Sequence, residues 1–170
     1  MSNRETFLDE IVNYQTRILN LIANSKDCAG LIVNKSANTV NDSDFDRVAD
    51  DFLFTHEFVD STIQQTAVFV WCEIEVIRAK TVTVKDLLVT VTVACHNDYM
   101  KLSRGLYPGR VGNRRDRLAL EIDKLLSFNM DFGIGRLSLT KCLTGKLSDK
   151  FTARRLEYFV PDFNYRSGVK

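Results

Sequence analysis

Residues Lys85–Asn97 read K-D-L-L-V-T-V-T-V-A-C-H-N, which is the strongest strand pattern in the chain. Val89, Val91 and Val93 alternate with threonine or alanine, and this period of two is typical of a strand with one strongly apolar face. The other face is small and only mildly polar, so we expect it to meet protein rather than open water. Leu87–His96 is therefore predicted to be the central strand of a sheet.

The length and composition are those of an ordinary globular domain. The chain has 170 residues, of which 45% are apolar and 26% charged, enough to bury a sizeable core. Its 2 prolines form no linker, so we expect a single domain over residues 1–170. The formal net charge of +1 argues against a surface built throughout for nucleic acid, although a local basic patch stays open.

The four cysteines, Cys28, Cys72, Cys95 and Cys142, lie far apart and form no CxxC pair. We expect all four to be reduced, as in a protein that matures in a cytoplasm. The sharper alternative is a zinc site that combines the last three with His96, but its spacing matches no standard ligand pattern.

The N-terminal stretch is not a signal peptide, because charged residues such as Arg4, Glu5 and Asp9 interrupt it. No apolar run approaches the ~20 residues that a membrane helix needs. The sequence therefore predicts a soluble protein without a membrane contact.

Two helices and three further strands are predicted around the central strand. Ser2 and Glu5 have the spacing of a capping box, and an apolar stripe follows to about Asn24. Asn113 is placed to cap a second helix, Arg114–Ser127. The other strands are Ala67–Ile77, which forms a hairpin with the central strand, Arg136–Cys142, and Phe151–Val160, which Pro161 stops. This is an α+β class: a small, mostly antiparallel sheet flanked by two helices, in the order helix, hairpin, helix, hairpin.

Residues 26–65 form a long connecting or interface segment. Ala29–Val33 has the composition of a short strand, and Asn34–Asp46 that of a loop. An aromatic block with no clean period follows. One interpretation is a short helix at 44–52 that folds onto the core. The other, which we favour, is an arm ordered only against a partner, with Phe52, Phe54 and Phe58 as its contacts.

The candidates for catalytic chemistry are weak. Glu73, Glu75 and Asp86 resemble the clustered carboxylates of a magnesium-dependent nuclease, but no lysine follows at the expected strand position. Alternating charges on a solvent-facing strand explain them better. His96 follows a strand, yet no nucleophile has a suitable setting, so we expect it to bond a loop backbone. We expect no enzyme activity, no metal and no cofactor.

Arginines gather in two places: the loop and helix start around residues 104–117, and the last strand. With Tyr99, Tyr107 and Tyr158 they could touch a nucleic-acid backbone. The alternative is a solvated face, or salt bridges to carboxylates of a neighbouring subunit. The near-zero net charge favours this second interpretation. The arginines are Arg104, Arg110, Arg114, Arg115, Arg117, Arg154 and Arg155.

Four stretches carry a resemblance to a known group: V-T-V-T-V-A-C-H-N-D, G-N-R-R-D-R-L-A-L-E-I-D-K-L-L, F-G-I-G-R-L-S-L and R-R-L-E-Y-F-V-P-D-F-N. In order and spacing, over residues 66–164, the chain resembles tail-terminator (tail-completion) proteins, structural proteins from the neck of long-tailed bacteriophages. The resemblance implies an α/β domain that forms a ring, usually a hexamer, at the top of the tail. Such a ring caps the tail tube and receives the head connector.

The resemblance further implies a non-enzymatic virion protein, made in the host cytoplasm, whose partners are its own copies, the tail tube protein and the head–tail connector proteins. A head-completion adaptor or stopper protein is the alternative role in the phage neck, and a small metal-dependent nuclease is the enzyme alternative. The basic loop has two candidate uses, a subunit contact or a non-specific contact with DNA in the lumen. The predicted interface residues are Phe52, Phe54, Phe58, Arg110, Arg114, Arg115, Arg154 and Arg155.

Overall fold

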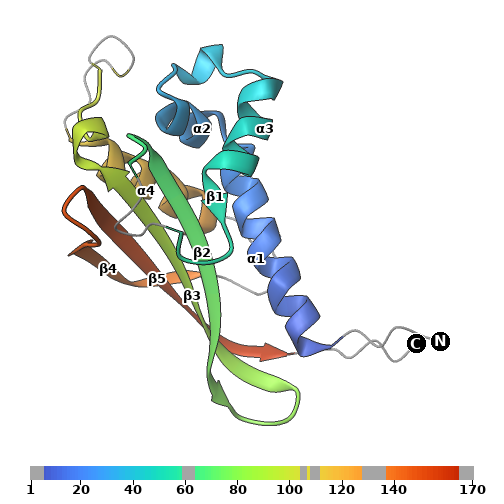
Figure 1. The fold of residues 1–170 in the computed structure, drawn as a ribbon. Helices are drawn as coiled ribbons and strands as arrows, with labels where there is room; N and C mark the ends of the chain where they lie inside the picture. The colour runs from blue at the N-terminus through green and yellow to red at the C-terminus, as the bar shows by residue number, and fades with distance from the viewer. Residues whose placement is uncertain (1–5, 59–63, 104–106, 108–111, 128–136, 165–170) are drawn as a thin grey trace.

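Five strands form one sheet, with the predicted strand at its centre (Figure 1). The computed structural model describes residues 6–58, 64–103, 107, 112–127 and 137–164. The strand order is β1-β2-β3-β5-β4, and every neighbouring pair is antiparallel except β1 and β2. The strands are β1 (Leu53–Phe54), β2 (Val68–Ala79), β3 (Val84–His96), β4 (Ser138–Lys146) and β5 (Phe151–Asn164). The central position predicted for Leu87–His96 is therefore confirmed.

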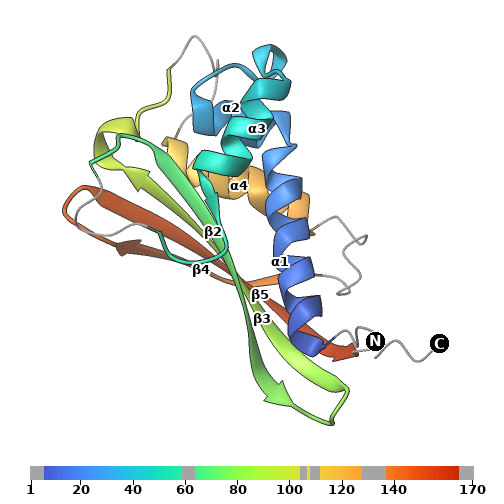
Figure 2. The ribbon, with the colours of Figure 1, turned by 45° about the vertical axis from the view of Figure 1, so that its right-hand side comes forward.

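The helices lie together on one side of the sheet (Figures 1 and 2). They are α1 (Phe7–Ala23), α2 (Lys26–Val33), α3 (Asp42–Asp51) and α4 (Arg114–Ser127). The predicted α+β class is confirmed; α1 and α4 are the two expected helices, and α2 and α3 are additional. Within the described ranges, none of these helices is long and apolar enough to cross a membrane.

The two sides of the sheet differ in what covers them. We call the side that carries α1 and α4 the helix face, and the opposite side the open face. Val89 lies on the helix face, beside Tyr158, whose hydroxyl donates to Asp123 of α4 at 3.1 Å. On the open face, Thr92 and Ala94 are also buried, as expected for side chains that meet protein.

The caps of the two predicted helices explain where they begin. α4 has the predicted bounds, because the Asn113 side chain accepts the N–H of Asp116 at 2.8 Å. α1 begins after Thr6, which forms a capping box with Asp9. The capping box predicted at residues 2–5 lies outside the described residues.

Residues 26–65 differ most from the prediction. Ala29–Val33, expected as a short strand, belongs to α2. Ser25 caps this helix by accepting the N–H of Cys28 at 3.4 Å, and Asn34 ends it in the left-handed conformation, with φ 61°. A short apolar run does not by itself separate a strand from a buried helix, so the caps on either side decide.

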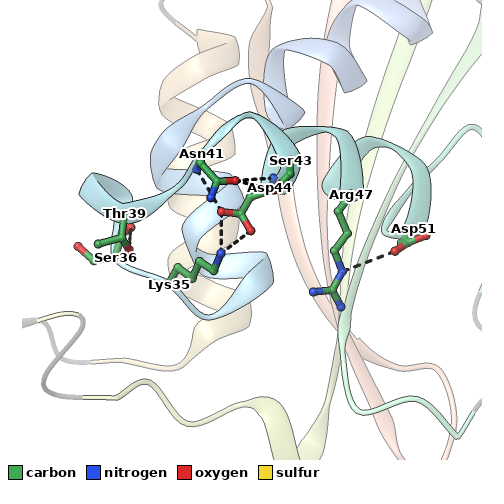
Figure 3. Close-up of polar contacts among 8 residues, drawn as sticks. All are labelled: Lys35, Ser36, Thr39, Asn41, Ser43, Asp44, Arg47 and Asp51. Carbon is green, nitrogen blue, oxygen red and sulfur yellow. Dashed lines mark hydrogen bonds and ion pairs between the residues drawn. The ribbon is translucent and has the colours of Figure 1, made fainter.

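The predicted loop Asn34–Asp46 contains the start of α3, which folds onto the core through the buried Val48. This corresponds to the short-helix interpretation rather than to the free arm. Figure 3 shows why the helix starts here: Asn41 and Asp44 bond each other's backbone N–H at 3.1 Å. The Asp44 carboxylate also accepts from Lys35 Nζ at 2.6 Å, which ties α3 to the end of α2.

The last hairpin is longer than predicted at both strands. β4 continues to Lys146, through part of the expected loop, and β5 runs past Pro161 to Asn164. Pro161 has no N–H to donate to a neighbouring strand. It is tolerated because β4 pairs with β5 only as far as Phe159, and because the ladder between β5 and β3 shifts register here, at Asp86. Asp162, at φ 55°, then donates its N–H to the Asp86 carboxylate at 3.1 Å.

Candidate interaction surfaces

Arg114, predicted as an interface residue, is only 2% exposed. Its guanidinium donates to Leu31 O at 2.5 Å, to Tyr99 O at 2.8 Å and to Asn34 Oδ1 at 2.6 Å. It also lies 4.0 Å from the centre of the Tyr99 ring. Leu31 is in the last turn of α2, where carbonyl groups lack helical partners and favour a cation. Arg114 therefore holds α2, α4 and the turn after β3 together, and has almost no surface left for a partner.

Asp116 gathers two more of the predicted interface arginines. Its carboxylate accepts from Arg154 at 2.7 Å, from Arg115 at 2.9 Å and from the Asn113 amide at 2.7 Å. Burial acts to raise the pKa of Asp116, but these bonds outweigh it and lower the pKa below its ordinary value. The expected carboxylate partners of these arginines are therefore found within the same chain.

The described arginines of the predicted basic patch are mostly buried or paired. Arg114 and Arg115 are buried and Arg154 is paired with Asp116, so Arg155 is the exposed member of this set. Arg110 lies outside the described residues. Contact with DNA through this group thus has little support from the described geometry.

The aromatic block packs on its own sheet. Phe54 and Phe58 stack with ring centres 3.9 Å apart, and Phe58 also meets Phe69 of β2 edge-on at 5.4 Å. Phe52 is buried and contacts the same Phe69 ring at 6.2 Å. Phe52 is thus part of the core, whereas Phe58 remains 39% exposed and is the member of the block best placed to meet another protein.

The acidic and histidine candidates lie in separate places. Glu73 and Glu75 are on the open face of β2, whereas Asp86 pairs with Lys80 at 2.8 Å. His96 Nδ1 accepts the N–H of Asp98 at 3.2 Å, the loop bond that the sequence predicts. Among the described residues, no three His, Cys, Asp or Glu side chains lie close enough to hold a metal ion.

The cysteines are free thiols. Cys28, Cys72 and Cys95 are buried, and burial raises the pKa of Cys28 and of Cys95 to about 12. These side chains behave as small apolar core residues. Cys142 on β4 is exposed, and its sulfur lies 3.7 Å from the Arg154 guanidinium.

The sheet has two free edges with different chemistry. At one edge, β1 pairs only with Val70 and Trp71 of β2. From Glu73 onward, no described strand pairs with the outer side of β2. At the other edge, all of β4 is exposed. The uncovered part of β2 carries Glu73 and Glu75, with Arg78 near its end, whereas β4 carries Lys141 and Lys146.

Exposed apolar side chains lie beside both edges. Leu139 of β4 and Leu120 of α4 line a shallow, mostly apolar groove of about 230 Å³ between these elements. Near the other edge, Leu8 and Val12 of α1 are 69% and 55% exposed. The hairpin between β2 and β3 projects from the body and ends in Val82, which is 90% exposed (Figure 2). These are surfaces suited to protein contacts.

Sequence reasoning expected exposed strand edges but did not identify which two strands form them, because the strand order decides which strands are outermost. The signal within reach was the alternation of Ile74 and Val76 with two glutamates, which marks one half-exposed strand. The sequence alone does not place Lys141 at the opposite edge. That position follows from the strand order, in which β5 lies between β3 and β4, so that β4 has a neighbour on one side only.

The comparisons with known proteins give one match. The family model described as YomW matches residues 16–160, which is most of the chain and includes β2, β4 and α4 but only the second half of α1. That name belongs to proteins of SPBeta-type phage, so the match makes the chain phage-associated. No curated protein and no solved structure matches the chain. By the family model, the chain belongs to the YomW family.

Proposed function

We propose that this chain is a structural protein of a phage virion that forms a ring at the neck, as a tail terminator. The observation that carries the proposal is the pair of unlike free edges on opposite sides of one sheet in a phage-associated protein. A ring requires two different, complementary surfaces on each subunit, because contacts between identical patches close into dimers instead. The edges supply such a pair.

The fold agrees with the architecture that the resemblance to tail terminators implies, a small sheet flanked by helices. The proposed partners are further copies in a ring of about six, the tail tube below and the head connector above. Phe58 and the projecting hairpin with Val82 are the proposed contacts with those partners, since both are exposed and apolar. A contact with DNA in the lumen would involve Arg155 and residues near Arg110.

Light scattering after size exclusion and negative-stain imaging of the purified chain test this proposal. We expect a ring with an open lumen, and co-sedimentation of that ring with phage tail tubes that lack their terminator. A ring that binds isolated head connectors but not tubes would identify an adaptor or stopper protein. A monomer at every concentration that also fails to bind tubes would refute the proposal.

A further inference from the structure

We propose that the ring closes by pairing β4 of one copy with the uncovered part of β2 in the next copy, so that the sheet continues from subunit to subunit. The inference rests on the proposed ring and specifies its contact. It identifies the partner at the β4 edge as a second copy of this chain, recognised by opposite charge on one face and by apolar contact on the other.

The directions of the strands permit this pairing. β2 is antiparallel to β3, β3 to β5 and β5 to β4, so β2 and β4 run in opposite directions at the two ends of the sheet. A second copy placed edge to edge therefore adds its β4 to β2 as one more antiparallel strand. Since the two edges are different surfaces, the contact repeats from copy to copy and closes when the rotation fits.

The backbone of β2 has groups available for this ladder. The N–H of Val70 bonds to Phe52 O at 2.9 Å, and the amide of Gln15 donates to the carbonyl of Cys72. Residues two apart in a strand point their backbone groups to the same side, so Ile74 and Val76 also face outward. No described strand covers them. The pairing therefore begins after Cys72, in the part of β2 that β1 and Gln15 do not cover.

The charges fall in the same row of the sheet. Following the ladder pairings across the strands, Glu73 lies beside Thr90, Thr90 beside Glu157, and Glu157 beside Lys141. A second copy in the same register brings its Glu73 next to Lys141 on the open face. The part of β4 that pairs in this register is Ser138–Cys142, because Leu143 and Thr144 fall in the rows of Trp71 and Val70, which β1 already covers. Lys141 is 65% exposed and 3.4 Å from Glu157, and its ammonium has donors left for another carboxylate. Within the described residues, Glu73 makes no ion pair.

The helix face adds apolar contact. Leu8, Val12 and Gln15 follow one another at helical spacing, so the exposed Leu8 and Val12 lie along the side of α1 that reaches the β2 edge. The opposite edge presents Leu139 and the nearby Leu120 of α4. A few strand residues are too small a contact for a stable ring, and these leucines and valines supply the further buried area.

The bulge and the lysines of β4 favour the same partner. Lysine on an edge strand and a local break in register are devices that prevent indiscriminate strand pairing. β4 has both features: it carries Lys141 and Lys146, and its ladder to β5 shifts register between Leu139 and Lys141. Lys141 disfavours neutral or basic edges but is complementary to Glu73, which lies in the same row of the sheet. The β4 edge can therefore pair with an acidic strand edge and disfavours others.

Disulfide trapping tests the pairing directly. In a chain with Cys142→Ser, we combine Glu73→Cys with Lys141→Cys and oxidise mildly. Facing residues on antiparallel strands have Cα atoms about 4.5–5.5 Å apart, within disulfide range. We expect a ladder of crosslinked species that ends at the number of copies in the ring.

The matched control, Glu73→Cys with Lys101→Cys, should give no ladder. Mixing the two single-cysteine chains should give crosslinked dimers only.

A charge reversal provides a second measurement. Glu73→Lys places like charges at the contact without touching the Lys141–Glu157 pair, so we expect association to weaken about tenfold or more while the monomer stays folded. Rings in the images without a ladder and without an effect of Glu73→Lys would overturn this inference and leave the proposed function standing. Chains that remain monomeric, form no ladder and bind no tubes would refute both.

Discussion

The two ends of the sheet differ in how their side chains are used. At the end near α2, α3 and α4, Arg114 and Asp116 are held by partners from distant parts of the chain, and Asp44 ties α3 to the end of α2. At the other end, the projecting hairpin exposes Val82 and half of Ile77. One end thus contains buried polar contacts that join several helices, whereas the other, beyond the ion pairs of Asp86, exposes apolar surface with no role in the core. Mutations at the two ends should separate stability from assembly.

Arg114→Ala should have the largest effect on stability. It leaves the buried carbonyl groups of Leu31 and Tyr99 without donors, and each such loss costs about 1–3 kcal/mol, so we expect a loss of about 3–5 kcal/mol. Urea unfolding followed by circular dichroism measures it. Arg114→Lys keeps the charge but loses the planar fork, so its loss should be intermediate. Wild-type stability in the alanine variant would contradict the bridging role.

Gly30→Ala should have the next largest effect. A Cβ at this position in α2 would lie 2.7 Å from Lys35 O, a backbone atom that is not free to rotate away. Overpacking of this kind costs about 1–3 kcal/mol, against a gain of about 1 kcal/mol in helix propensity. We expect a net loss of up to about 2 kcal/mol in the same unfolding experiment. Gly145→Ala, in the open space of β4, is the matched control and should change little.

Asp116→Asn should produce a pH-dependent loss of about 1 kcal/mol at pH 7, because bonds to charged groups are partly screened at a half-exposed site. The pKa of Asp116 is lowered in the folded state, so its contribution is complete above the ordinary aspartate pKa of about 3.9 and is lost as the pH falls through the folded value. The difference between wild type and variant should therefore shrink between pH 5 and pH 2, by about the whole 1 kcal/mol. A constant difference would exclude the charge as its source.

Val82→Ser at the hairpin tip should have the smallest effect on stability, within about 0.5 kcal/mol, because the side chain is 90% exposed. The informative measurement is binding of the ring to tail tubes. If the tip contacts the tube, binding weakens while unfolding stays unchanged. A stability loss comparable to that of Gly30→Ala would erase the proposed difference between the two ends.

The sequence was most informative where local signals agreed. Asn113 and the apolar stripe of α4 predicted both bounds of that helix, and the valine–threonine alternation placed β3 at the centre. Local signals conflicted in α2, where a short apolar run between Ser25 and Asn34 suits a strand as well as a helix. Its helical state is fixed by partners such as Tyr99, whose hydroxyl bonds Ile32 O at 3.0 Å.

The candidate surfaces were harder to predict, because charge alone does not reveal burial. Arg114 and Arg155 look equivalent in the sequence, yet one is buried among carbonyl groups and the other is exposed. The carbonyl of Leu31, which accepts from Arg114, belongs to a segment whose helix was itself missed. The edge residues Glu73 and Lys141 acquire meaning only from the strand order.

The contact between Phe7 and Phe163 brings the first helix and the last strand together, with ring centres 6.0 Å apart. Elements so distant in the chain and so close in space favour circular permutation: a short linker could join them, and new ends could be opened in the projecting hairpin near Val82. Such a rearranged chain would display a fused tag at the tip of that hairpin, far along the chain from the caps of α4 and α3.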